Sequence, residues 1–156
     1  MKAKEGVIEF LNQVLRAELT AVHQYLLHAA LCKNWGYGRL HDHYSHLANE
    51  EVSHSSGLID HILYVDGTPD VEHLDAIAHG KDVAALFAAD LEFEREDAEL
   101  LRQAIVHCAK VGDFTTRHIL EHMIVDTEEH IDWFETQLRV IKQIGLDRYL
   151  CEQMKQ

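Results

Sequence analysis

Apolar residues recur every three or four positions through four long stretches of the chain, residues 4–33, 39–65, 82–111 and 114–144. This is the spacing of one face of an α-helix, so it predicts four amphipathic helices of about 30 residues each. A shorter stretch at residues 147–154 predicts a brief C-terminal helix. The pattern therefore indicates an all-α protein built around a four-helix bundle.

The connections between these stretches are short, with one exception. Residues 34–38, 112–113 and 145–146 contain glycines that end a helix, and short turns place consecutive helices antiparallel. Residues 67–82 form the long connection and hold the only proline, Pro69. Fully extended, such a segment reaches about 50 Å, which matches a helix of about 30 residues rising about 1.5 Å per residue. We expect it to cross the full length of the bundle, so that the second and third helices run in the same direction.

A flexible linker between two domains is the alternative explanation of this long segment. Each half of the chain would then be a pair of helices whose apolar faces have nothing to cover them. We therefore expect a single domain that comprises residues 1–156.

A polar residue or pair interrupts the apolar face near the middle of each long helix. In chain order the interruptions are Glu18, Glu51 with His54, Glu94 and His130. Glu51 and His54 are three residues apart and therefore lie one turn apart on the same face. A carboxylate or imidazole within an apolar face costs on the order of several kcal/mol unless it is paired. A metal ion is one such partner, and a hydrogen-bonded Glu–His pair is the alternative for this motif alone.

Together, the four interruptions are more specific than any one of them. In helical bundles that hold two metal ions, two helices each give one Glu and the other two each give Glu-x-x-His. This chain offers Glu on three helices and His on two, at similar heights. Such a set of carboxylates and imidazoles suits iron or manganese.

The composition limits the classes of partner that the protein is expected to bind. The chain has 156 residues, 47% of them apolar, and a formal net charge of −13. This charge argues against nucleic acid and anionic membranes and suits a protein that attracts cations, although solvated surface glutamates explain it equally. No apolar run approaches the roughly 20 residues that span a bilayer. No signal peptide precedes the first helical pattern, which favours a cytoplasmic protein.

Cys32, Cys108 and Cys151 are scattered and form no C-x-x-C motif. This pattern predicts reduced thiols, again as expected in the cytoplasm. The sequence assigns no chemistry to Cys151, nor to most of the histidines outside the four interruptions, although 13 His is a high number for the chain.

The chain as a whole resembles bacterioferritin, a family of ferritin-like proteins. The resemblance runs from end to end of the sequence. The positions that carry it are Val7-Ile8, Leu11-Asn12, Leu15, Glu18-Leu19, Gln24-Tyr25, Trp35-Gly36, Glu51, His54, Gly67-Thr68-Pro69, Asp90-Leu91, Glu94, Leu101-Arg102, His130-Ile131-Asp132-Trp133, Gly145-Leu146 and Tyr149-Leu150.

This resemblance implies a hollow cage of 24 subunits, oxidation of Fe(II) at a di-iron centre inside each four-helix bundle, and an Fe(III) mineral stored in the cavity. It implies that Glu18 and His54 hold one iron and that Glu94 and His130 hold the other. Glu51 would then bridge the two irons.

Two positions depart from the family pattern. The family holds haem with a Met from each of two subunits, at the position directly after the bridging Glu, where this chain has Val52. Because Val has no donor atom, we expect no haem in a homo-oligomer. The family also has a second bridging Glu three residues before His130, where this chain has Thr127.

The exchange at position 127 removes a charge from the expected centre. Two Fe²⁺ ions carry four positive charges, whereas Glu18, Glu51 and Glu94 supply three negative ones, and an uncompensated charge is costly in a poorly solvated core. A Thr hydroxyl is a weak ligand by comparison. We therefore expect Thr127 to impair the centre unless an anion, or Asp126 from a nearby face of the same helix, completes it.

Three further residues are candidates near the metals. His46 and Glu50 are four residues apart on the second helix, away from its apolar face. In the family such a pair faces the cavity and binds iron in transit, and a solvated ion pair is the alternative. Tyr25, two helical turns from Glu18, could supply an electron or a hydrogen bond near the metals, although core packing is the commoner role of a Tyr.

We therefore predict a cytoplasmic iron-storage protein that forms a homo-oligomeric cage, with a ferroxidase centre impaired by Thr127. The alternative is a non-catalytic structural subunit that stores iron or co-assembles with a complete bacterioferritin subunit, which would supply the missing Met and Glu. A rubrerythrin-like peroxidase is disfavoured, because three scattered cysteines cannot form a four-cysteine iron site.

Overall fold

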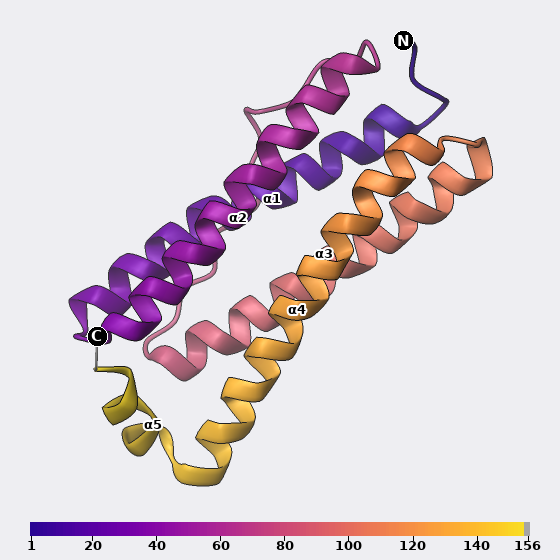
Figure 1. Cartoon of the computed structure of the whole chain (residues 1–156). Coiled ribbons are helices and arrows are strands. Elements are labelled where there is room, and N and C mark those ends of the chain that lie inside the picture. The colour runs from indigo at the N-terminus through magenta and orange to yellow at the C-terminus, as the bar shows by residue number, and fades with distance from the viewer. Residues whose placement is uncertain (155–156) are drawn as a thin grey trace.

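Five helices make up the described part of the chain, residues 1–154, in the computed structural model (Figure 1). They are α1 (Val7–Asn34), α2 (Gly38–Tyr64), α3 (Val83–Val111), α4 (Phe114–Ile144) and α5 (Leu146–Gln153). The predicted all-α fold is confirmed, and the largest error in a helix boundary is at the start of α1, predicted at residue 4. Across residues 1–154, no helix combines the length and apolarity needed to cross a membrane.

The helix ends follow from local chemistry. The Asp82 side chain caps α3 by accepting a hydrogen bond from the backbone N–H of Ala85 at 2.8 Å. The Asp113 side chain caps α4 in the same way, from the N–H of Thr116 at 3.0 Å. Between these two helices Gly112 adopts φ 75°, the left-handed conformation that ends many helices and that glycine adopts without a steric penalty.

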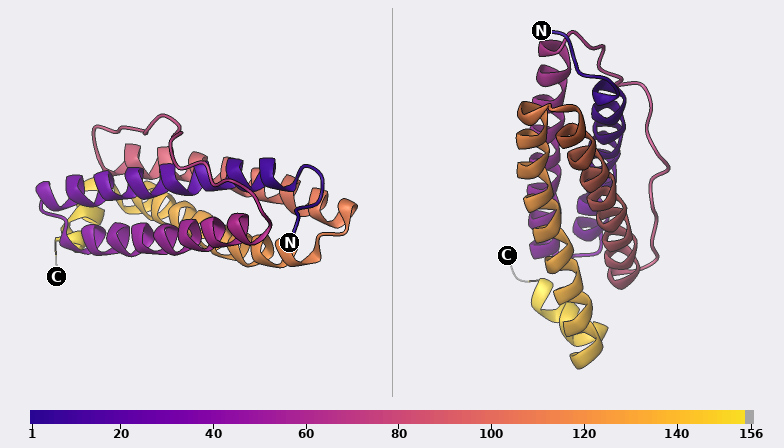
Figure 2. Two further views of the ribbon diagram at one scale, coloured as in Figure 1. Left: turned by 90° about the horizontal axis from the view of Figure 1, so that it is seen from above. Right: turned by 90° about the vertical axis from the view of Figure 1, so that its right-hand side faces the viewer.

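The helices pack as two antiparallel pairs. α1 lies against α2, α3 lies against α4, and α1 also contacts α3 (Figures 1 and 2). α2 and α3 run in the same direction, as the length of the connection between them predicted (Figure 1). The short α5 lies at the end of the bundle where α4 finishes, and it contacts both α4 and α2.

The crossover between α2 and α3 runs along the outside of α1 (Figure 2). Three polar side chains of α1 hold its backbone by hydrogen bonds. The Asn12 Oδ1 accepts from the N–H of Asp70 at 2.8 Å, the Thr20 Oγ1 accepts from the N–H of Asp75 at 3.0 Å, and the Gln24 Oε1 accepts from the N–H of Ala78 at 3.0 Å. The long connection is therefore held against α1 by hydrogen bonds at three points along it.

Two apolar clusters fill the bundle, one on each side of a polar layer. The largest fully buried side chains of the cluster nearer α5 are aromatic: Tyr25, Tyr44, Phe87 and Phe134. The other cluster is mainly aliphatic and includes Leu11, Leu15, Leu58, Leu101 and Leu120. On each long helix, the polar residues singled out by the sequence fall between the residues of these two clusters.

A separate polar network surrounds Asp90, which is fully buried on α3. The Gln24 Nε2 donates to its Oδ1 at 2.6 Å, and the Tyr44 hydroxyl donates to its Oδ2 at 2.6 Å. The His28 Nδ1 lies 2.8 Å from the same Oδ2, while its Nε2 donates to the Ala78 carbonyl at 3.1 Å. Asp90 thereby ties α1, α2 and α3 to the crossover.

Candidate metal centre

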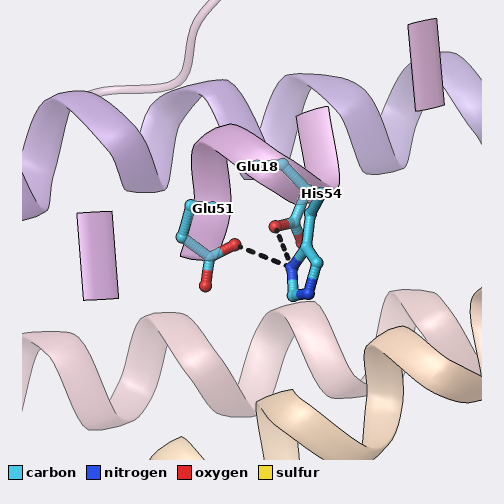
Figure 3. A group of neighbouring side chains, drawn as sticks. All are labelled: Glu18, Glu51 and His54. Carbon is cyan, nitrogen blue, oxygen red and sulfur yellow. Dashed lines mark hydrogen bonds and ion pairs between the residues drawn. The ribbon is translucent and has the colours of Figure 1, made fainter. Parts of the chain in front are cut away.

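Glu18, Glu51 and His54 form one group of side chains in the polar layer that could hold a metal ion (Figure 3). The His54 Nδ1 lies 3.2 Å from Oε2 of Glu18 and 3.3 Å from Oε2 of Glu51. Glu18 comes from α1, while Glu51 and His54 come from successive turns of α2. One potential ligand atom from each residue lies within 4.8 Å of the other two, which is close enough for all three to bind one ion.

Glu51, Glu94 and His130 form a second such group. The His130 Nδ1 lies 3.2 Å from Oε1 of Glu94 on α3 and 3.5 Å from Oε1 of Glu51. Glu51 therefore belongs to both groups and turns a different oxygen to each histidine. The structure brings together, from four helices, all five residues that the sequence singled out.

The carboxylates of both groups are withdrawn from solvent. Glu18 and Glu94 are each 1% exposed, and Glu51 is 4% exposed. His130 is buried, and His54 is half-buried. A buried cluster of three acids is unfavourable without cations to balance it, because each ionised carboxylate loses hydration that the protein interior does not replace.

The outward nitrogen of each histidine is held by a further carboxylate. The His54 Nε2 lies 2.8 Å from Oδ2 of Asp126, and the His130 Nε2 lies 2.6 Å from Oε2 of Glu50. The His46 Nε2 extends the second contact, 2.8 Å from Oε1 of Glu50. Metal-binding histidines commonly use one nitrogen for the ion and the other for a carboxylate that orients the ring. The structure thus places Asp126, Glu50 and His46 on the outer side of the histidines.

This position of Asp126 differs from the one considered from the sequence, where it was a candidate to replace the missing carboxylate at position 127. Its Oδ2 contacts the outward nitrogen of His54 instead of joining Glu18, Glu51 and Glu94 inside the centre. The Thr127 hydroxyl donates to the Met123 carbonyl at 3.1 Å, one turn back along α4. Neither residue belongs to the two groups that could hold an ion.

Tyr25 lies beside the second group. Its hydroxyl donates a hydrogen bond to Oε1 of Glu94, and its ring packs in the aromatic cluster near Tyr44 and Phe134. Burial raises the pKa of Tyr25 well above its usual value, and the charge of Glu94 adds to the rise. Tyr25 therefore remains a neutral hydrogen-bond donor that orients Glu94.

The electrostatics of the carboxylates follow from burial and crowding. Burial raises the pKa of Glu18 well above its usual value, and the charge of Glu51 adds to this. Burial likewise raises the pKa of Glu94, although its hydrogen bond with His130 opposes the rise. For Glu51, burial is outweighed by hydrogen bonds to Glu18 and His54, so its pKa is lowered.

The two histidines act as internal cations in the metal-free chain. Burial lowers the pKa of His54, but the contacts with Glu51 and Asp126 outweigh it and raise the pKa to about 9. Burial also lowers the pKa of His130, and Glu94 and Glu51 raise it to about 10. Both imidazoles therefore carry a proton near neutral pH, and a metal ion bound at Nδ1 must displace it.

A cavity of about 190 Å³ opens beside the second group. Its walls include His43, His46, Glu50, His130 and Trp133. The His43 ring stacks on Trp133 with ring centroids 3.7 Å apart, and the His43 Nε2 is buried without a hydrogen-bond partner among residues 1–154. The cavity therefore reaches Glu50 and the outward side of His130.

Asp97 is the acidic neighbour of the centre that the sequence interpretation missed. It lies on α3 one turn after Glu94 and is 6% exposed. Its Oδ2 lies 3.5 Å from the Thr127 hydroxyl. The spacing of Glu94 and Asp97, which equals that of Glu51 and His54, was the signal available in the sequence.

The sequence is similar to ferritin-like proteins along nearly its whole length. Residues 8–144 match the ferritin-like domain of the ferritin family. The chain is 38% identical over 155 residues to a bacterial ferritin of Synechocystis, with 99% of both chains covered. It is 37% identical over 155 residues to a bacterial ferritin of Pseudomonas aeruginosa, covering 99% of this chain and 100% of that one. It is 36% identical over 152 residues to a bacterioferritin of Mycolicibacterium paratuberculosis, covering 97% of this chain and 96% of that one.

Proposed function

Because the chain belongs to the bacterioferritins, a ferritin-like family of iron-storage proteins, we propose that it stores iron and oxidises Fe(II) at the two groups that share Glu51. Fe²⁺ is the substrate, and the Fe(III) product is stored as a mineral inside a cytoplasmic cage of 24 subunits. The observation that carries the proposal is the double contact of Glu51, whose two oxygens face the Nδ1 atoms of His54 and His130.

The residues of the centre fit two divalent ions. Carboxylate and imidazole donors suit Fe²⁺, and Glu51 can touch both ions at once. An ion in the first group would be held by Glu18, Glu51 and His54, and an ion in the second by Glu51, Glu94 and His130. Two ions held side by side allow two one-electron oxidations to be coupled to one two-electron reduction of the oxidant.

The reaction balances with O₂ as the oxidant. Two Fe²⁺ lose one electron each, and O₂ takes the two electrons and two protons to give hydrogen peroxide. With hydrogen peroxide as the oxidant, the same two electrons and two protons give two molecules of water. The protons displaced from His54 and His130 on binding are released close to where the oxidant takes them up.

The remaining polar contacts orient the donors. Asp126 and Glu50 hold the outward nitrogens of His54 and His130, which keeps each Nδ1 aimed at the centre. Tyr25 fixes one oxygen of Glu94. His46 and Glu50 border the cavity beside His130 and would pass ions between the cage interior and the centre.

An exposed apolar surface supports assembly with further subunits. Val52 is 51% exposed, and with Leu19, Val22 and Ile59 it lines a largely apolar groove of about 270 Å³. A second copy that covers this groove would bury apolar side chains from water. Val offers no atom to bind haem iron, so the proposed homo-oligomeric cage carries no haem at this position.

Oxidation kinetics test the proposed activity. Aerobic addition of Fe²⁺ to the purified protein should give a rapid oxidation phase, monitored by near-ultraviolet absorbance. His54→Ala should remove this rapid phase. His23→Ala is the matched control, because His23 is an exposed histidine on α1. A wild-type curve that matches uncatalysed oxidation of Fe²⁺ would contradict the proposal.

A second candidate function is a non-catalytic cage subunit, which stores iron or co-assembles with a complete bacterioferritin subunit. Thr127 is the observation that favours it, because its hydroxyl is used by the Met123 carbonyl and brings no charge to the centre. This alternative predicts at most one tightly bound ion per purified chain and activity restored by Thr127→Glu. An active wild-type homo-oligomer would exclude it.

A further inference from the structure

Asp97 has the burial and position of a ligand but lacks a matching partner. It is 94% withdrawn from solvent, and its Oδ1 is one of two buried side-chain atoms without a hydrogen-bond partner among residues 1–154. Its Oδ2 has only the Thr127 hydroxyl at 3.5 Å, at the limit of a hydrogen bond. That hydroxyl has one proton and lies closer to the Met123 carbonyl, at 3.1 Å. A buried carboxylate satisfied this poorly is unusual and points to a missing cation.

The surroundings of Asp97 are acidic. Its carboxyl group is close enough to that of Glu18 for a hydrogen bond, and the charges of Glu94 and Glu51 also act on it. Two facing carboxylates offer only acceptors to each other unless they share a proton. A divalent cation placed between them would satisfy both, as it does in carboxylate-bridged metal sites.

We propose that Asp97 is the fourth carboxylate ligand of the di-metal centre, supplied by α3 at the place where Thr127 of α4 carries no charge. The inference rests on the proposed function, since it adds a ligand to the same centre. The Asp97 carboxylate lies beside the Thr127 side chain, whose small size leaves room for it between α3 and α4. The charge absent from position 127 is thus provided by a neighbouring helix.

The charge balance changes with this assignment. The centre then has four negative charges, which equal the four positive charges of two Fe²⁺ ions. They come from Glu18, Glu51, Glu94 and Asp97. The deficit expected from Thr127 alone therefore disappears. A centre neutral overall avoids the cost of an uncompensated charge in the core.

A cavity beside Asp97 gives ions access to it. This cavity has a volume of about 160 Å³ and is lined by residues of α1 and α3, including Ala17, Phe93 and Asp97. Glu96 and Asp75 also line it, and Asp75 is ion-paired with Arg16 at 2.8 Å. This cavity is distinct from the one beside His130.

Anaerobic titration of the full chain with Co²⁺, followed by calorimetry and visible absorbance, tests the assignment. The wild type should bind two Co²⁺ per chain. Asp97→Asn keeps the size of the side chain and should weaken the second ion more than about tenfold, since even the loss of residues that only orient ligands costs about 10–100-fold. Glu92→Gln, the same loss of charge at an exposed site on α3, should leave two tight ions.

Moving the carboxylate from position 97 on α3 to position 127 on α4 tests whether Asp97 binds the ion directly or acts only through its charge. In the Asp97→Asn background, Thr127→Glu should restore the second tight ion, whereas Thr127→Glu in the wild type should give no gain. Circular dichroism verifies that each variant is folded. A crystal of the wild type soaked with Co²⁺ gives a reading that needs no variant: Asp97 Oδ1 should coordinate an ion directly.

The outcomes separate this inference from the proposed function. Two tight ions in both the wild type and Asp97→Asn would overturn the role of Asp97 and leave the di-metal centre intact. A wild type that binds no Co²⁺ would overturn both. Thr127→Glu that raises the stoichiometry of the wild type from one to two would show that Asp97 does not fill the place of the missing Glu.

Discussion

Glu51 turns its two carboxylate oxygens towards two different histidines, with Oε2 3.3 Å from Nδ1 of His54 and Oε1 3.5 Å from Nδ1 of His130. The two histidines come from α2 and α4, so Glu51 connects the two antiparallel helix pairs. This shared residue makes one centre out of two groups that would otherwise be separate sites for single ions.

Glu51→Gln should therefore lose more than one ligand contact. The amide has the shape of the carboxylate but no charge, and only one of its two terminal atoms can accept a hydrogen bond or bind a cation. We expect fewer than two tightly bound Fe²⁺ per chain in anaerobic titration, and loss of the rapid phase of iron oxidation. Two tight ions and an unchanged rate in this variant would show that Glu51 is not the bridge.

The metal-free protein should become less stable as the pH rises from 6.5 to 10. The pKa values of His54 and His130 are raised from 6.5 to about 9 and about 10 in the folded chain. The folded state therefore holds more protons than the unfolded state over this range, and the stabilisation is full below about pH 6.5 and lost as the pH passes about 9–10.

Thermal unfolding of chelator-treated protein across this pH range measures the effect. The double variant His54→Ala/His130→Ala corrects for tyrosines and lysines, which also titrate near pH 10. Its melting temperature should depend less on pH than that of the wild type. If the melting temperatures of the two proteins change with pH in parallel, His54 and His130 are not the cause of the pH dependence of stability.

Asp90→Asn should destabilise the fold without touching the metal centre. Asp90 is fully buried and receives contacts from Gln24, His28 and Tyr44, of which His28 also donates to the Ala78 carbonyl. Removal of one partner of a buried ionic contact costs about 3–5 kcal/mol. Denaturant unfolding should show a loss of this size, with Glu92→Gln as the exposed control on the same helix. A loss below about 1 kcal/mol, the size expected for an exposed pair, would mean that the buried contacts of Asp90 contribute little to stability.

Val52→Met tests the proposed reason for the absence of haem in a homo-oligomer. The side chain of Val52 is 51% exposed in an apolar groove, so a longer thioether fits there without a change in the core. Two such groups from paired subunits would supply two sulfur ligands to haem iron. Reconstitution with haem should give a Soret band in the variant and none in Val52→Leu, which has a similar size but no sulfur. Equal haem uptake by both variants would contradict this reason.

The fold could be predicted almost completely from the sequence, because helix periodicity and glycine stops depend on local chemistry. The same periodicity located Glu18, Glu51, His54, Glu94 and His130, since each interrupts an apolar face. Their convergence required only that the four faces meet in one core. The roles of these residues as ligands stay predictions until a metal is located.

Asp97 and Asp90 were missed, although the three-residue spacing of Glu94 and Asp97 was visible in the sequence. Each directly precedes an apolar residue of the α3 face, Ala98 and Leu91 respectively, and one residue corresponds to about 100° of helix rotation. An acid at such a border position points either to solvent or into the bundle. The neighbouring helix decides: Thr127 is small enough to admit Asp97, and His28 supplies a partner for Asp90. These contacts join residues distant in sequence, so periodicity alone does not contain them.

Location of the bound ions tests the central claim most directly. A crystal soaked anaerobically with Fe²⁺ and measured at the iron absorption edge should show two anomalous peaks inside each bundle. One peak should lie among Glu18, Glu51 and His54, and the other among Glu51, Glu94 and His130. An interior without peaks, or iron found only on the surface of the bundle, would contradict the account.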